Sequence, residues 1–242
     1  MKWEKKLDLL SYIASNLEMI HSHNIIHCDL HSGNIFQDDL NNAYIGDLGF
    51  ATSINKALVK GSGGLYGVLR YTAPEVLCGN PFTQASDIYS FGMIMWEISS
   101  GKVVFPDRKY DDAIFQMDIR GGLRPIILED TPICFANLLK KCWDQNPEKR
   151  PSALEIHKTI IDWKNDKGTL LEFLKSDNSM KANNFTFEIS DDNYEIYSSK
   201  FINNIRQKMD GMDTSNFVSD NNYIISDNNY IISDNNYIIS DS

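Results

Sequence analysis

The sequence predicts a mainly α-helical domain with a small β-hairpin over residues 1–163, followed by a low-complexity tail over residues 164–242. Apolar side chains recur at steps of four and three residues from residue 3 to residue 21, which is typical of an amphipathic helix. Residues 88–98 are apolar on most sides, which indicates a helix buried in the domain centre. After about Lys164 the composition turns to Asn, Asp, Ser and isolated aromatics, and all seven prolines lie between Pro74 and Pro151.

The first predicted helix leads into a loop and a hairpin. Its buried face consists of Trp3, Leu7, Leu10, Ala14, Leu17 and His21. Residues 24–27 have no helical period and are expected to enter a loop. Ile35-Phe36 and residues 43–45 then flank the polar turn at 38–42, which predicts two short paired strands. This hairpin would place Asp47, just after its second strand, opposite Asn34, just before its first.

Three later helices have recognisable starts. The apolar helix at 88–98 is preceded by Asp87; a buried carboxylate there must be hydrogen-bonded, and the alternative is an exposed helix-capping Asp. Thr131-Pro132 predicts a cap followed by proline at the first helical position. Residues 152–155, Ser-Ala-Leu-Glu, predict a capping box.

Composition limits the class of protein. A region of about 170 residues can bury a proper hydrophobic core. The net charge of −10 argues against a nucleic-acid partner and against an anionic membrane surface. The four cysteines lack any C-x-x-C spacing, which indicates reduced thiols in a cytosolic or nuclear protein, and we expect a cytoplasmic location. No apolar run approaches the length needed to cross a bilayer, and Asp8 and Ser11 interrupt the run that could suggest a signal peptide.

The tail contains a seven-residue repeat. Ser-Asp-Asn-Asn-Tyr-Ile-Ile begins at 219 and recurs to residue 239, with a degenerate copy at 189–194. The three apolar residues are consecutive rather than at coiled-coil spacing, and Asn, Asp and Ser are poor in helix interiors. We expect a disordered repeat expansion; the alternative is self-association through stacked Tyr-Ile-Ile triplets.

The segment 27–34, His-Cys-Asp-Leu-His-Ser-Gly-Asn, and Asp47-Leu48-Gly49 carry the chemistry. Reactions of a metal-bound polyphosphate need a carboxylate that orients or deprotonates the attacking hydroxyl, and an amide oxygen and a second carboxylate that hold Mg²⁺ on the phosphates. Asp29, Asn34 and Asp47 supply these groups. The arrangement resembles the catalytic loop and metal-binding segment of the eukaryotic protein kinases, H-R-D-L-x-x-x-N followed by D-F-G, with substitutions in both.

Further motifs follow in the kinase order. Ala73-Pro74-Glu75 stands where A-P-E closes the activation segment, residues 86–92 resemble the start of the central helix, and Cys142-Trp143 through Arg150-Pro151 resembles the C-x-W…R-P ending of the large lobe. Four motifs in the right order are far more specific than any one. The resemblance covers residues 1–163, is closest to tyrosine-kinase-like Ser/Thr kinases, and implies the C-terminal lobe of a protein kinase domain.

This resemblance implies a role for each matching residue. Asp29 would be the catalytic base, with His31 beside it, and Asn34 and Asp47 would bind Mg²⁺. Phe36 and Asp47 would lie on the ATP side of the site. The expected cofactors are therefore ATP and Mg²⁺, and the expected partners are protein substrates or a partner kinase.

Four other residues would support the loop. His27 would pack inward as part of the core, and Asp87 would hold the backbone of the catalytic loop. Glu75 and Arg150 would form the buried ion pair that attaches the end of the activation segment to the lobe. Breaking such a pair leaves one buried charge unpaired, at a cost of about 3–5 kcal/mol.

Several substitutions depart from the kinase pattern. Cys28 stands where kinases most often have the Arg that receives an activation-segment phosphate, so we expect such phosphorylation not to be the main switch. His31 replaces the usual Lys of Ser/Thr kinases and could donate to a phosphate oxygen if protonated. Val68 replaces their Thr, and Leu48 replaces the Phe of D-F-G, a mild apolar swap. Tyr-specific kinases usually have Pro near position 68, so Ser/Thr substrates are favoured.

The most serious departure lies upstream. Only twenty-eight residues precede Asp29, and they include no Gly-rich loop over ATP, no strand Lys for the α- and β-phosphates and no helix Glu to pair with it. We therefore expect this chain by itself to bind ATP weakly and to transfer phosphate poorly or not at all. Two functions follow: a kinase sequence interrupted at its N-terminus, which the intact base and metal ligands favour, or a pseudokinase-type binding or scaffold module.

Two patterns suggest other sites. His21, His23, His27 and His31 lie close enough in sequence for zinc, but the kinase resemblance explains their spacing better. Residues 61–67, Gly-Ser-Gly-Gly-Leu-Tyr-Gly, could be mistaken for a phosphate-binding loop, although the G-x-G-x-x-G spacing and a following Lys are missing, so a loop without that function is expected.

Overall fold

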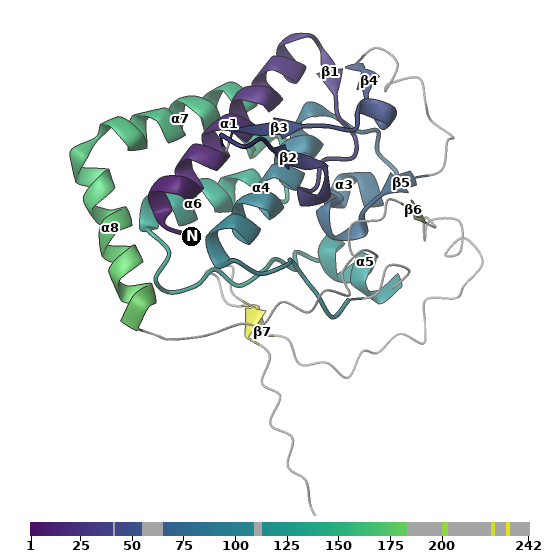
Figure 1. Cartoon of the computed structure of the whole chain (residues 1–242). Helices are drawn as coiled ribbons and strands as arrows, with labels where there is room; N and C mark the ends of the chain where they lie inside the picture. Colours follow the sequence, from purple (N-terminus) through teal and green to yellow (C-terminus); the bar gives the residue numbers. More distant parts are fainter. Residues whose placement is uncertain are drawn as a thin grey trace, which may run out of the picture.

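The computed structural model describes residues 1–40, 42–54, 65–108, 113–182, 200–202, 224–225 and 231–232 (Figure 1). Its helices are α1 (Trp3–Ser22), α3 (Pro74–Leu77), α4 (Gln84–Ser100), α5 (Ala113–Arg120), α6 (Ile133–Cys142), α7 (Ala153–Asn165) and α8 (Lys167–Ala182). Short 3-10 turns lie at Ser32–Asn34, Leu48–Phe50, Leu69–Tyr71 and Pro147–Lys149. The described part is therefore mainly α, as the sequence predicted.

The described strands form antiparallel pairs. They are β1 (Ile25–Ile26) with β4 (Thr52–Ser53), β2 (Ile35–Gln37) with β3 (Ala43–Ile45), β5 (Leu65–Gly67) with β6 (Lys200–Ile202), and β7 (Ile224–Ile225) with β8 (Ile231–Ile232). The β2–β3 hairpin is the one predicted, with Phe36 opposite Tyr44. It lies against α1, and because its two strands are antiparallel, the segment before β2 and the segment after β3 meet at the open end of the hairpin (Figure 1).

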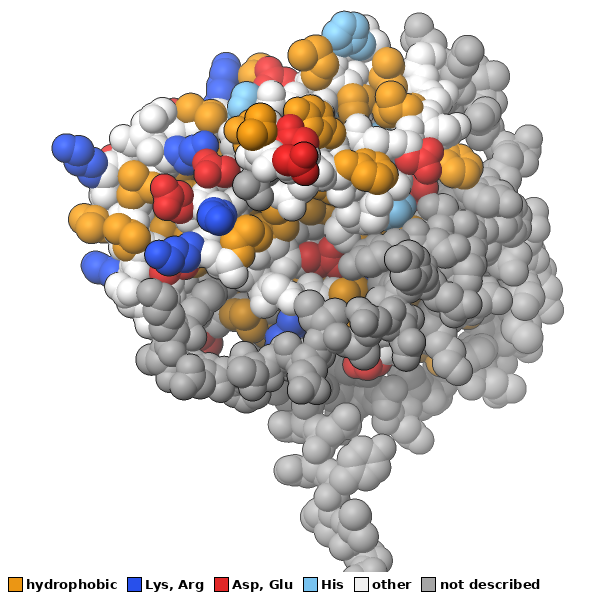
Figure 2. Space-filling view, viewed as in Figure 1, with side chains coloured by type: hydrophobic (Ala, Val, Ile, Leu, Met, Phe, Trp, Pro, Cys, Tyr) orange, Lys and Arg blue, Asp and Glu red, His pale blue; other side chains and the backbone are white. Residues whose placement is uncertain are grey.

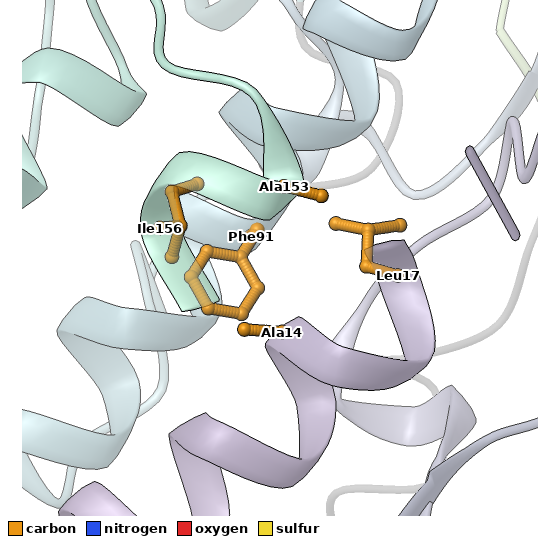
Figure 3. A pocket seen from close by; sticks show the side chains of 5 residues that line it. All are labelled: Ala14, Leu17, Phe91, Ala153 and Ile156. Atoms are coloured by element: carbon orange, nitrogen blue, oxygen red, sulfur yellow. The ribbon is translucent and has the colours of Figure 1, made fainter. Parts of the chain in front are cut away.

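Helix α4 forms the centre of the domain, and α1, α6 and α7 pack around it (Figure 1). In its middle, Phe91 packs between Ala14 and Leu17 of α1 and Ala153 and Ile156 of α7 (Figure 3). The gap between these side chains is too small for a water molecule, as in other protein cores. The apolar residues at 88–98 are thus buried, as their pattern predicted.

The helix starts follow local capping. The predicted capping box of α7 is confirmed, because Ser152 and Glu155 each bond the other's backbone N–H. A second box, Thr83 with Ser86, starts α4. Helix α6 begins one residue later than predicted: Pro132 is its N-cap, and no side chain caps the helix there.

The tail expected from residue 164 begins in the structure with a further helix, α8, which packs against the domain. Phe173 of α8 is 2% exposed and packs against Trp3 and Trp163, with ring centroids 5.1 and 5.8 Å apart. The Trp3 indole N–H donates to Ser176 Oγ at 2.7 Å, and the Trp3 backbone N–H donates to the Asp177 carboxylate at 3.0 Å. Residues 167–182 are polar overall, so the sequence did not predict this helix. A few apolar side chains are enough to pack it against the domain.

The rest of the tail is described at three short strands. Ile224 pairs with Ile232 and Ile225 with Ile231, so the Ile-Ile steps of two successive repeats face each other within the chain. Strand β6 pairs with β5 of the domain. The expectations for the other tail residues, and for the Gly-rich loop at 61–64, lie outside the described residues. In the described part of the chain, no helix has the length and apolar content of a membrane span.

Candidate active site

The segment 27–34 forms a loop between β1 and β2, and Asp87 of α4 holds its backbone. One carboxylate oxygen of Asp87 accepts the His27 N–H at 2.8 Å and the other accepts the Cys28 N–H at 3.1 Å. The first oxygen also lies 2.9 Å from His21 Nε2 of α1. Asp87 is fully buried and is not the N-cap of α4, a position that Thr83 takes, so the exposed-cap alternative is wrong.

Cys28 has a left-handed backbone, with φ of 70°. A non-glycine residue adopts this conformation at a cost of about 1 kcal/mol or more, so surrounding contacts must hold it. The two bonds from Asp87 to consecutive N–H groups supply that constraint. The turn at Cys28 leads directly to Asp29, which is 4% exposed. The carboxylate proposed as the base is therefore fixed at the loop rather than carried by a mobile surface segment.

His27 joins the loop to the segment before Asp47. Its ring is fully buried, Nδ1 accepts the Asp29 backbone N–H at 3.3 Å, and Nε2 lies 3.0 Å from the Gly46 carbonyl. The first contact makes Nδ1 the acceptor, so the proton belongs on Nε2, which donates to Gly46. The sequence predicted that His27 packs inward; its bridging contacts come from the structure.

Asn34, at the end of the loop, also contacts both Asp29 and Gly46. Its side-chain Nδ2 donates to the Asp29 carbonyl at 2.9 Å, and its backbone carbonyl accepts the Gly46 N–H at 2.9 Å. With the amide nitrogen engaged, the amide oxygen is the atom that can meet a cation. Asp47 follows Gly46 directly. Asn34, before β2, and Asp47, after β3, therefore lie at the same end of the hairpin, as the sequence predicted.

Asp47 has a left-handed backbone, with φ of 55°, and its Oδ1 accepts the Gly49 N–H at 3.2 Å. Its carboxylate is exposed. The ring of Phe36 lies against Gly46, where an added Cβ would be 2.5 Å from ring carbon Cε2. A side chain at 46 would therefore displace Phe36, which is 56% exposed and presents its ring beside Asp47's segment.

His31 is buried and faces Asp29. Its Nε2 lies 3.8 Å from Asp29 Oδ2, and the two groups form an ion pair only if the imidazole is protonated. Its ring centroid is 5.9 Å from that of Tyr71. The structure thus places His31 next to the proposed base.

A buried network behind the loop was missed by sequence reasoning. Ser32 Oγ lies 2.8 Å from the Tyr71 hydroxyl, which donates to Glu97 Oε1 at 2.7 Å. The same Glu97 oxygen accepts the Val104 N–H at 2.9 Å. Burial raises the pKa of the Glu97 carboxyl. The signal available was a single acidic residue inside the otherwise apolar helix at 88–98.

The segment after β5 closes the site on the other side. Gly67 is buried and has φ of 151°, and a Cβ there would lie 3.6 Å from Asp29 Oδ1. Asp29, Leu30, Gly67, Val68 and Thr72 line one small hollow between this segment and the catalytic loop. The acceptor end of a substrate would have to enter near this hollow to reach Asp29.

Glu75 and Arg150 form a bidentate ion pair. The two guanidinium nitrogens donate to the two carboxylate oxygens at 2.7 and 2.8 Å. The Arg150 side chain is fully buried and also donates to the carbonyls of Ala85 and Asp144, both at 2.9 Å. The pair attaches α3, at the end of the segment that contains Gly67, to the turn before α7.

The zinc alternative finds no support in the described part of the chain, where no group of three or more His, Cys, Asp or Glu side chains converges. His21 contacts Asp87 and His27 contacts Gly46, so both imidazoles have structural partners. Figure 2 shows hydrophobic side chains scattered among charged and polar ones on this face of the domain, and several large ones are exposed on α1, on the hairpin and just after it. They are Tyr12, Met19, Phe36, Tyr44, Leu48 and Phe50.

Known proteins with similar sequences are protein kinases. The family model for protein tyrosine and serine/threonine kinases matches residues 1–160. A candidate serine/threonine-protein kinase/receptor of Acanthamoeba polyphaga mimivirus is 37% identical over 160 residues, which is 64% of this chain and 9% of that protein. The serine/threonine/tyrosine-protein kinase HT1 of Arabidopsis thaliana is 32% identical over 153 residues, 63% of this chain and 38% of HT1.

The dual specificity protein kinase shkE of Dictyostelium discoideum is 35% identical over 134 residues, which is 55% of this chain and 19% of shkE. The chain therefore spans well under half the length of each of these relatives. The matched region contains the catalytic loop, Asp47 and the Glu75–Arg150 pair. The chain belongs to the family of protein tyrosine and serine/threonine kinases.

Proposed function

We propose that this chain is the lobe of a protein kinase that orients a Ser or Thr hydroxyl of a protein substrate for phosphoryl transfer from ATP. Asp29 acts as the catalytic base in this proposal. The protein would act in the cytoplasm, where the free thiols of all four cysteines would stay reduced. Ser/Thr specificity rests on Val68, since kinases specific for Tyr usually have Pro near this position. The relatives' names include Ser/Thr, Ser/Thr/Tyr and dual-specificity kinases.

One observation carries the proposal. Asp29 is a buried carboxylate on a loop whose backbone is held from both sides, by Asp87 at the preceding residues and by the Asn34 side chain at its own carbonyl. General-base and orienting carboxylates act through geometry held in advance, because a hydroxyl must sit within hydrogen-bond reach of the oxygen. A carboxylate that served only packing would not need this support.

The residues present fit Mg²⁺ and ATP. Mg²⁺ prefers oxygen ligands and is commonly bound through one or two carboxylates together with substrate phosphates. The Asn34 amide oxygen and the exposed Asp47 carboxylate are such ligands, and the exposed ring of Phe36 offers an apolar face for a base. When bound, the metal would neutralise charge on the transferred phosphoryl group. His31, beside Asp29, would donate to an anionic substrate group when protonated.

Within residues 1–242, no Gly-rich loop with a following Lys accompanies this site. We therefore propose that the chain, tested alone, binds ATP weakly and transfers phosphate poorly or not at all. The second candidate function is a pseudokinase-type module that binds a partner, such as another kinase, without phosphoryl transfer. The exposed aromatic and apolar side chains on the hairpin and just after it, Phe36, Tyr44, Leu48 and Phe50, favour it, because exposed apolar surface of this kind can mark interaction sites.

Nucleotide titration of purified 1–242 separates these candidates. A fluorescent ATP analogue is titrated with and without Mg²⁺ into the wild type, Asp47→Asn and, as a matched control, Asp39→Asn, which alters an exposed carboxylate on the hairpin turn. We expect weak, Mg²⁺-dependent binding that Asp47→Asn lowers by about tenfold or more and Asp39→Asn leaves unchanged. A nucleotide affinity that changes neither with Mg²⁺ nor in Asp47→Asn would favour the binding module.

Phosphoryl transfer is measured on the same proteins with mixed Ser, Thr and Tyr peptides, followed by phosphoamino-acid analysis. Any transfer should go to Ser or Thr and disappear in Asp29→Asn while nucleotide binding stays. Transfer that survives Asp29→Asn would overturn the assignment of the base. Robust autophosphorylation by the wild-type chain would overturn the expectation of low activity.

A further inference from the structure

Strand β6 comes from the tail, beyond the residues that the kinase family model matches, yet it pairs with the domain beside the candidate active site. Lys200 lies opposite Gly67, Phe201 opposite Tyr66 and Ile202 opposite Leu65, in antiparallel register. Figure 1 shows β5 and β6 together at the edge of the domain. The kinase motifs do not predict this contact between the tail and the domain.

The position of β5 makes the contact significant. The strand ends at the buried Gly67. A Cβ added to this glycine would lie 3.6 Å from Asp29 Oδ1. Gly67 and Asp29 line the same hollow. A peptide that extends along β5 is therefore led to the carboxylate proposed as the base.

Strand addition is a general way to bind peptides. An extended segment that pairs with an exposed strand edge gains main-chain hydrogen bonds without requiring a particular sequence. In the register observed, residue 200 is the position next to Gly67, and the chain supplies Lys there. Residues 200–202, Lys-Phe-Ile, also favour a strand more than the Asn-, Asp- and Ser-rich sequence around them.

We propose that Leu65–Gly67 is a docking edge for extended peptides and that the chain's own Lys200–Ile202 occupies it as an autoinhibitory strand. The segment competes with peptides that approach from solution. That such peptides are kinase substrates rests on the proposed function, but the occupancy of the edge by the tail strand depends on neither phosphoryl transfer nor ATP.

The tether sets the size of the effect. Residues 183–199 join α8 to β6, and a linker of such length gives an effective local concentration of about 1 mM. A three-residue strand pairing is weak, and for an intrinsic dissociation constant of about 0.1 mM this local concentration leaves about one tenth of the edges open. A free peptide would then bind the wild type about tenfold more weakly than a chain whose tail strand cannot pair.

The test uses the full chain and a fluorescein-labelled peptide copying residues 197–205, with binding followed by anisotropy. Phe201→Pro removes a backbone N–H and restricts the strand, so it should release β6 from β5. Ile231→Pro is the matched control, because it places the same change in β8, which pairs with β7 rather than with the domain. We expect the peptide to bind Phe201→Pro about tenfold more tightly than the wild type or Ile231→Pro.

Hydrogen exchange gives a second measurement on the same three proteins. The backbone amides of residues 65–67 should be protected in the wild type and in Ile231→Pro and should exchange faster in Phe201→Pro; addition of the peptide should restore their protection. Equal peptide affinity for all three proteins, or no binding to Phe201→Pro, overturns the proposal. Because no nucleotide is present, a failed phosphoryl-transfer assay leaves this outcome unaffected, so the two proposals fail separately.

Discussion

Replacing Phe173 by Ala tests whether α8 belongs to the folded unit. Phe173 lies in the middle of α8 with its ring between Trp3 and Trp163. The substitution keeps a good helix former and removes only the buried ring. If the domain ended near residue 163, as the composition suggested, this change in the following segment would leave the stability of the domain unaffected.

The magnitude follows from the burial. A phenylalanine ring that is 2% exposed hides about 150–200 Å² from water, which corresponds to about 4–5 kcal/mol at ~25 cal/mol per Å². Burial relative to a compact unfolded chain is smaller, and α8 lies at the edge of the domain, where it can undock locally rather than leave a cavity. We therefore expect a loss of about 3 kcal/mol in the free energy of unfolding. For a domain of this size that lowers the Tm by about 6–12 °C.

Urea unfolding followed by tryptophan fluorescence is the assay, because Trp3 and Trp163 both contact the replaced ring. Leu174→Ala is the matched control: it lies on the same helix, is 56% exposed, and should change stability by less than about 0.5 kcal/mol. A Phe173→Ala protein within about 0.5 kcal/mol of wild type would refute the docking of α8. Hydrogen exchange over 167–182 distinguishes local undocking from global loss.

Three further predictions concern the site. Asp87→Ala leaves two catalytic-loop N–H groups without their acceptor and should cost about 2–5 kcal/mol in urea unfolding; an unchanged midpoint would contradict the role of Asp87. Glu75→Gln should cost about 3–5 kcal/mol by leaving the buried Arg150 charge unpaired, and the double variant with Arg150→Met should cost less than the sum of the single changes, or the ion pair is not coupled. Burial raises the pKa of the Glu97 carboxyl, so the folded state binds its proton more readily than the unfolded state does. The contribution of Glu97 to the free energy of unfolding is therefore most favourable below the ordinary carboxyl range and is lost as the pH rises through the raised pKa. Glu97→Gln keeps an acceptor oxygen, so its stability relative to wild type should increase as the pH rises above the ordinary carboxyl range; a difference independent of pH would exclude this titration.

Several features were determined by the sequence alone because they depend on neighbours along the chain. The period of apolar residues from Trp3 onwards specifies α1, and the polar turn at 38–42 between two apolar runs specifies the β2–β3 hairpin. The Ser152 capping box specifies the start of α7. The motif order was sufficient for the family, since spaced motifs of this kind persist while the residues between them vary.

The contacts that connect these parts were decided only by the tertiary structure. A pattern shows that Asp87 needs a partner, but not that both its oxygens meet consecutive N–H groups of a loop sixty residues upstream. Glu97, Tyr71 and Ser32 form a network from three separate segments.

The extent of the folded unit is the clearest case. Residues 167–182 have a polar composition that predicts a tail, and no local signal distinguishes Phe173 from a solvent-exposed aromatic. Its burial depends on Trp3 and Trp163 arriving at the same place once α1 and α7 have packed together. Local sequence thus determined which elements form, whereas the long-range packing of a few side chains decided that α8 joins the folded unit.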